Sequence, residues 1–284
     1  MIQPTNNNLL NHLHPGDFEL LAPHLKPFNA PANHVLYDTG QTVSTVYFPC
    51  GATLVSFVIS TEDGGAVETM LVGREGAVGG IVSQGKLPAY SRIMVQFGGE
   101  FLTLPVALVD ELKLKSGSFG NLFARYADCV MAQIFQSTVC NAAHTIEQRA
   151  AKWIIAAIER TNDNKVPLTQ DRLAAMLGVG RSYISRVIGE LKRDGIVAIR
   201  RGYLLVDDAR GSSRDRAAAM GQSKLTSIRF YAAFIQMIRM RSCLGLWFKV
   251  YLSNATLHTR PYFLKFLEAF GRAKTGGRSL GLLQ

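Results

Sequence analysis

The chain has 284 residues, of which 48% are hydrophobic and 18% are charged. This balance excludes a largely disordered chain, and the length allows two domains with cores of their own. The N-terminus lacks a basic segment followed by an apolar one. We therefore expect no signal peptide and a cytoplasmic location.

The formal net charge of +10 is concentrated at the C-terminal end. Residues 209–284 contain 13 Lys and Arg against 2 Asp and Glu, whereas residues 1–208 contain 18 and 19. We interpret 209–284 as an atypical basic tail, either poorly ordered or appended through an altered reading frame, with an interfacial or partner-binding helix as the alternative. Arg239, Arg241 and Lys249 interrupt its apolar stretch and argue against a transmembrane helix, so no membrane partner is expected.

The remainder is predicted to be an α+β protein that begins with one or two short helices within residues 9–26. After Phe28, short β-branched and aromatic runs alternate with Gly-containing turns about every ten residues. This pattern is typical of an antiparallel β jelly-roll barrel, which we assign to residues 1–117. The expected strands span residues 35–37, 43–48, 53–59, 67–72, 93–97 and 101–104.

A long helix is predicted for residues 118–144, because no Pro or Gly follows Gly120 and large apolar residues recur at steps of three and four. The apolar stripe is wider than one contact surface needs. One face can therefore pack on the barrel and the other on a second copy of the chain. This interpretation predicts a homodimer; the alternative is a core helix of a monomer.

Residues 145–208 are predicted to form a winged helix-turn-helix, introduced by a helix with a capping box at Thr145 and Gln148. A second helix begins at Gln170, with Thr169 as its cap. Counted from Gln170, a small residue, a glycine and two apolar residues fall at positions 5, 9, 15 and 18. This spacing is typical of two helices that cross at a tight turn.

The helix predicted over residues 181–194 carries polar residues on its outward face, near its N-terminal end. Arginine can bind guanine O6 and N7 together, and serine can bond base edges or phosphates. We predict base contacts from Arg181, Ser182, Ser185 and Arg186. Tyr183 and Thr169 are assigned to phosphates, although Tyr183 could instead pack on the wing.

Two short strand patterns, 196–199 and 203–206, flank Arg200, Arg201 and Gly202. An exposed hairpin with two arginines at its tip is suited to phosphate contact. The alternative is a purely structural hairpin.

The sequence predicts neither a metal nor another cofactor, and no enzymatic activity. Cys50, Cys129, Cys140 and Cys243 form no C-x-x-C pair and lie at no metal spacing from histidine. The chain also lacks the nucleophile elbow, the H-E-x-x-H motif and the phosphate-binding loop.

The order of barrel, long helix, helix-turn-helix and wing over about residues 10–208 resembles the Crp–Fnr family of bacterial transcription regulators. The resemblance is strongest in residues 173–186. It implies a homodimer that binds a palindromic promoter site on double-stranded DNA, with RNA polymerase as a further partner. The family's recognition arginines match Arg181 and Arg186, but Ser182 replaces the acidic base reader between them, so the family's best-known operator does not carry over.

The barrel resembles the family's cyclic-nucleotide-binding domain, but its ligand motifs depart from the pattern. Gly79 and Gly80 follow the Gly turn, and Gly80 occupies the position of the ribose-binding glutamate. Ser91 precedes Arg92, which reverses the order of the phosphate-binding pair. These four residues are the candidates for an effector pocket, and we expect a subgroup that does not bind cyclic AMP. The small-molecule effector stays unidentified.

The alternative to DNA binding is a function of a different class. The barrel could act as a sensor or scaffold through protein partners, without sequence-specific DNA binding. The helix spacing and the arginine-tipped hairpin favour DNA.

Overall fold

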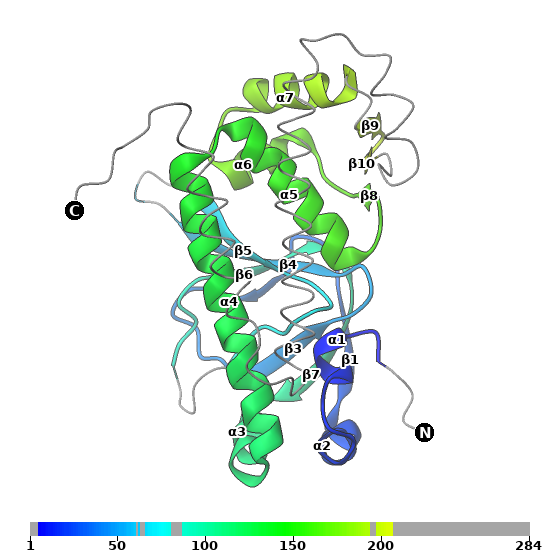
Figure 1. Cartoon of the computed structure of the whole chain (residues 1–284), viewed down its shortest axis with the longest axis vertical. Helices are drawn as coiled ribbons and strands as arrows, with labels where there is room; N and C mark the ends of the chain where they lie inside the picture. The colour runs from blue at the N-terminus through cyan, green and yellow to red at the C-terminus, as the bar shows by residue number, and fades with distance from the viewer. Residues whose placement is uncertain (1–4, 61, 63–65, 81–86, 194–196, 207–284) are drawn as a thin grey trace, which may run out of the picture. The chain divides into compact units, whose positions relative to one another are not determined.

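A computed structural model describes residues 5–60, 62, 66–80, 87–193 and 197–206 (Figure 1). The chain divides into two units, residues 1–235 and 236–284, and every described residue belongs to the first. The basic tail assigned to 209–284 lies outside the described residues. Among the described helices, none combines the length and the hydropathy that a membrane-spanning segment requires.

The N-terminal half is the expected antiparallel β-structure, built from two sheets. Short helical segments precede it, namely α1 (Asn8–Asn11), α2 (Pro15–Leu21) and the 3-10 helix η1 (Ala22–His24). One sheet has the order β1-β7-β3 and the other β2-β6-β4-β5, with every pair antiparallel. The strands are β1 (Lys26–Ala30), β2 (Val35–Tyr37), β3 (Thr45–Pro49), β4 (Leu54–Ser60), β5 (Ala66–Val72), β6 (Arg92–Phe97) and β7 (Gly99–Pro105).

The core of the β-structure is apolar and closely packed. Val55, Val78, Val95 and Phe101 are fully buried within one hydrophobic cluster. All six strands expected from the sequence are present, although their ends differ by up to two residues. Two elements were not expected, the edge strand β1 and the helix α3 (Val106–Lys115).

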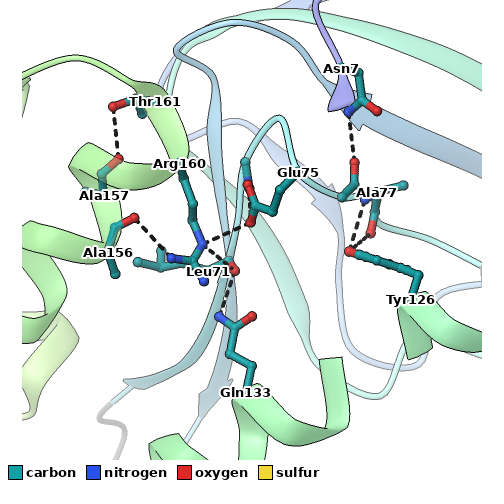
Figure 2. Close-up of polar contacts among 12 residues, drawn as sticks. Asn7, Leu71, Glu75, Ala77, Tyr126, Gln133, Ala156, Ala157, Arg160 and Thr161 are labelled. Atoms are coloured by element: carbon teal, nitrogen blue, oxygen red, sulfur yellow. Dashed lines mark hydrogen bonds and ion pairs between the residues drawn. The ribbon is translucent and has the colours of Figure 1, made fainter. Parts of the chain in front are cut away.

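Helix α4 (Gly117–Ala143) is the predicted long helix. Its first half buries Phe119, Leu122, Phe123 and Tyr126. The Tyr126 hydroxyl donates to the Ala77 carbonyl oxygen at 2.9 Å and accepts from the Ala77 N–H at 3.0 Å (Figure 2). This contact fastens the middle of α4 to the loop that follows β5.

The C-terminal described segment has the order expected of a winged helix-turn-helix. It comprises α5 (Ile146–Thr161), β8 (Lys165–Val166), α6 (Gln170–Leu177), α7 (Arg181–Arg193), β9 (Val197–Arg200) and β10 (Tyr203–Val206). The capping box predicted at the start of α5 is present, with both of its hydrogen bonds. The three strands pair in the order β8-β10-β9; β8 was not expected.

This segment shares a hydrophobic cluster with the larger sheet. Leu54, Leu71 and Phe97 of the sheet belong to the same cluster as Trp153 and Leu173. The rings of Phe97 and Trp153 meet edge to face, with centroids 6.1 Å apart. Apolar contact of this kind stabilises the fold in proportion to the area removed from water.

Polar contacts surround that cluster. Arg160 Nε lies 3.0 Å from Glu75 Oε1 and donates to the Leu71 carbonyl oxygen at 3.2 Å (Figure 2). An Arg172 guanidinium nitrogen donates to the Val95 carbonyl oxygen at 3.2 Å. The α5 and α6 helices are therefore held to the β-structure by side chains of their own.

Glu68 of β5 has a strongly raised pKa. Trp153 Nε1 donates to its Oε1 at 2.6 Å, whereas Oε2 is buried without a hydrogen-bond partner among the described residues. Burial raises the pKa of Glu68 to about 8, although Trp153 and the cations Arg160, Arg172 and Lys152 act in the opposite direction.

We expect Glu68 to make stability depend on pH. Because its pKa is raised in the folded state, the native chain retains a proton that the unfolded chain has released between the ordinary value of 4.5 and about 8. Folding stability should therefore fall as pH rises through this window, by at most about 1.4 kcal/mol per pH unit. Urea unfolding at several pH values measures the slope, which E68Q should flatten.

The control is E190Q, which alters an exposed carboxyl of α7 and should keep the native slope. Equal slopes for E68Q and the unmodified chain between pH 5 and 8 would contradict the raised pKa of Glu68.

Candidate nucleic-acid interface

The two helices α6 and α7 meet through a tight turn, as the sequence predicts. Thr169 caps α6 by accepting from the Arg172 N–H at 3.3 Å. Gly178 ends α6 with a φ of +67°, a left-handed conformation that suits glycine. The Val179 N–H then donates to the Ala174 carbonyl oxygen at 3.0 Å, which completes the end of α6.

One face of α7 is buried and the opposite face is accessible to solvent. Ile184, Val187 and Ile188 are at most 2% exposed and belong to the cluster shared with α5 and α6. Arg181, Ser182 and Arg186 are exposed, and Ser185 is half-buried. The four residues predicted to contact bases therefore lie on the solvent-accessible part of a firmly anchored helix.

Two of these side chains already have partners on α6. Arg181 Nε lies 3.2 Å from Asp171 Oδ1, in an exposed ion pair that contributes little to stability. Ser185 Oγ donates to Gln170 Oε1 at 2.7 Å. Neither contact is deeply buried, so either side chain can exchange its partner for another.

Tyr183 was predicted to contact phosphate or to pack on the wing, and in the structure it contacts α5. Its hydroxyl donates to Glu147 Oε1 at 2.5 Å. The Arg186 guanidinium carbon lies 4.6 Å from the centroid of the Tyr183 ring. The hydrogen bond lowers the pKa of Glu147, because the donated O–H stabilises the carboxylate. It raises the pKa of Tyr183, because loss of the phenol proton would break the same bond.

Sequence reasoning did not identify Glu147, Gln170 or Asp171 as part of this surface. Gln170 and Asp171 stand in the first turn of α6, where helix-turn-helix geometry brings them near α7, so their spacing was a usable signal. Glu147 is separated from Tyr183 by 36 residues. Only the tertiary fold, in which α5 packs on α6 and both share a core with α7, brings the two together.

The predicted wing is the hairpin of β9 and β10. Tyr203 pairs with Arg200, so Arg201 and Gly202 form a two-residue turn, with φ of +87° at Gly202. Arg200 and Arg201 are both exposed. Their guanidinium groups are available to an anionic partner.

The four candidate effector residues of the barrel differ in what surrounds them: Gly79 and Gly80 are closely packed, Ser91 is buried, and Arg92 is exposed in an ion pair. A side chain at Gly79 would place its Cβ 2.4 Å from the Thr45 carbonyl oxygen, and one at Gly80 would place it 2.6 Å from a Val106 methyl group. Ser91 is 2% exposed. Arg92 Nε instead lies 2.6 Å from Asp38 Oδ1 on the exposed side of the sheet.

Within the described ranges, no three His, Cys, Asp or Glu side chains are grouped so that they could hold a metal ion. Cys50, Cys129 and Cys140 are free thiols. Cys243 lies outside the described residues.

Comparison with known proteins identifies the C-terminal described segment. Residues 148–211 match the Crp-like helix-turn-helix domain family. A search of curated proteins finds no match to the sequence.

Solved structures of the same fold include three regulators. CLP, a c-di-GMP-responsive global regulator from Xanthomonas campestris, is 14% identical with a TM-score of 0.56; the match covers 69% of this chain and 100% of CLP. FixK2 from Bradyrhizobium japonicum is 12% identical with a TM-score of 0.55, covering 65% and 93%. A CRP-family transcriptional regulator from Thermus thermophilus is 18% identical with a TM-score of 0.52, covering 64% and 92%.

The left-handed backbone of the turn between α6 and α7 can be tested by two matched Gly→Ala substitutions, one in the turn and one inside α7. We expect Gly178→Ala to lower the free energy of unfolding by about 1–2 kcal/mol, because its left-handed φ strains a residue with a Cβ. Gly189→Ala, inside α7 with no atom within 4 Å of the added Cβ, should instead raise it by about 1 kcal/mol. Urea unfolding measures both changes. Similar changes at both positions would contradict a turn that requires left-handed backbone.

Proposed function

Because residues 148–211 match a Crp-like helix-turn-helix domain within the fold of Crp–Fnr transcription regulators, we propose that this protein binds a palindromic promoter site as a homodimer. The recognition helix, residues 181–194, enters the major groove. The supporting observation is the position of Arg181, Ser182 and Arg186, exposed on a helix whose opposite face is buried.

The exposed arginines suit base recognition in chemistry and in position. The major groove admits an α-helix and presents guanine O6 and N7, which one guanidinium can bind together. Arg181 begins α7 and Arg186 lies about one and a half turns later, so both are near the N-terminal end that usually enters the groove. Ser182 and Ser185 contact base edges between them.

Phosphate contacts fix the register of the domain on the duplex. Arg200 and Arg201 extend from the turn of the wing, and Thr169 stands exposed at the start of α6. Phosphodiester oxygens only accept hydrogen bonds, so Tyr183 can donate to a phosphate only if its single O–H first leaves Glu147. The two contacts of the Tyr183 hydroxyl therefore exclude each other. These contacts supply affinity without sequence preference.

The proposed dimer forms through the second half of α4. Met131, Ile134, Phe135 and Val139 are 48%, 40%, 64% and 57% exposed, at helical spacing along one stripe. A second copy of α4 covers this stripe and pairs the two recognition helices. Two-fold symmetry then requires half-sites about one turn of DNA apart, roughly 34 Å.

The barrel in this proposal receives a signal other than cyclic AMP, or serves only as a scaffold for the dimer. Gly80 supplies no carboxylate for a ribose, and Arg92 is paired with Asp38. RNA polymerase is the further partner that the Crp–Fnr resemblance implies for a promoter-bound regulator. The competing function, a scaffold that acts through protein partners alone, lacks a role for the exposed arginines of α7.

Selection from a random duplex pool tests DNA recognition. We expect the full chain to select a two-fold symmetric site, and the variant R181A/R186A to lower discrimination by at least about tenfold, since a bidentate base contact contributes roughly 1–3 kcal/mol. R200A/R201A should instead weaken binding to all duplexes and reduce the salt slope by about one for each phosphate interaction that the substitutions remove. Unchanged selection by R181A/R186A would remove the basis of this function.

The dimer is tested by sedimentation at several protein concentrations. F135E places a charge in the exposed stripe of α4 and should raise the dimer dissociation constant by at least about tenfold, because burying an unpaired charge is costly. L114E is the matched control, since Leu114 of α3 is 75% exposed and lies outside the stripe. Dimers that persist in F135E, or dissociate equally in L114E, would place the interface elsewhere.

A further inference from the structure

Tyr183 connects the start of α5 to a residue of the recognition surface. Its hydroxyl donates to Glu147 Oε1, and its ring lies 4.6 Å from the Arg186 guanidinium carbon. A guanidinium over an aromatic face is attracted by the negative potential of the ring. The three side chains therefore form a continuous series from α5 to the exposed face of α7.

The position of Glu147 is itself well determined. It lies in the first turn of α5, inside the capping box formed by Thr145 and Gln148. Arg149, two residues later, donates to the Leu177 carbonyl oxygen at 3.2 Å and ties the same turn to the end of α6. A hydrogen bond from Tyr183 to this turn orients the phenol ring relative to the whole domain.

Orientation matters for Arg186 because an exposed arginine has many rotamers, and ordering them on binding costs affinity and weakens discrimination. A guanidinium already held on a ring loses less freedom when it meets a base edge. Arg181 and Ser185 have partners, Asp171 and Gln170, that compete for the groups that DNA would bind. Arg186 is instead contacted by the ring and hydroxyl of Tyr183, and its five N–H donors exceed what that one hydroxyl can accept.

We propose that Glu147 is a positioning residue for base recognition, which acts through the Tyr183 hydroxyl to hold the phenol ring beneath Arg186. Glu147 touches no base in this arrangement; it determines the direction from which Arg186 approaches one. The inference rests on the proposed function, specifically on a base contact by Arg186. A merely structural hydrogen bond between α5 and α7 would alter the stability of the domain but not its choice of sequence.

The test measures discrimination at one base pair. R186A first identifies the position of the selected site at which Arg186 acts. Dissociation constants for the best duplex and for duplexes changed at that position then give the discrimination ratio for each variant. We expect Y183L, which removes the ring, to lower this ratio by about two- to fivefold, the range expected for an exposed cation–π contact. Y183F and E147A keep the ring but release its hydroxyl, and each should lower the ratio by part of that amount, less than R186A does.

Three further variants separate positioning from other effects. E147Q keeps an oxygen acceptor and should recover much of the ratio. The double variant E147A/Y183F should match either single variant, because both remove the same hydrogen bond. E190A removes a carboxylate from the exposed side of α7, and should raise affinity for all duplexes without changing the ratio.

An NMR measurement in the absence of DNA tests whether the Tyr183 ring holds Arg186. The Arg186 side-chain NMR signals of the full chain should show a ring-current shift that Y183L abolishes and that E147A reduces.

If Y183F and E147A keep the native ratio, or lower affinity for all duplexes equally, the positioning role is wrong while DNA recognition stands. If the unmodified chain selects no sequence, or R186A changes no position, both the proposed function and this inference fail.

Discussion

Burial of the apolar face of α7 is the interaction on which the candidate site depends. Ile184, Val187 and Ile188 pack into a cluster with Leu173 of α6 and Trp153 of α5. With three residues of one helix face removed from water, the helix cannot rotate without exposing them, at a cost of several kcal/mol. Its remaining face is therefore presented in one orientation, which is the condition for recognising base edges.

The sequence predicted the elements whose periodicity is strong and missed those without it. The spacing of Ala174, Gly178, Ile184 and Val187 predicted the helix pair, and Thr145 with Gln148 predicted the capped start of α5. Strand β1 contains Pro27 and lacks apolar alternation; the proline is tolerated because β1 is an edge strand. Helix α3 had a usable signal in Val109 and Leu112, both buried, which follow Pro105 at helical spacing.

The candidate site could be predicted only in part. Helical periodicity separates inward from outward residues, so it identified Arg181, Ser182 and Arg186 as exposed. It cannot show what those side chains contact, because Glu147 approaches Tyr183 through the packing of two helices that are distant in sequence. For the same reason, composition gave no hint that the Glu68 carboxyl lies against Trp153, since its strand alone has the pattern of an ordinary half-exposed one.

The cluster that joins Leu54, Leu71 and Phe97 to Trp153 has a consequence for how the molecule comes apart. The N-terminal β-structure and the winged helix-turn-helix share this part of the core, so heat or denaturant should unfold them together in a single cooperative transition. A fragment restricted to the winged helices would leave the indole of Trp153 and neighbouring aliphatic groups in water. Such a fragment would be less stable than the parent and prone to self-association.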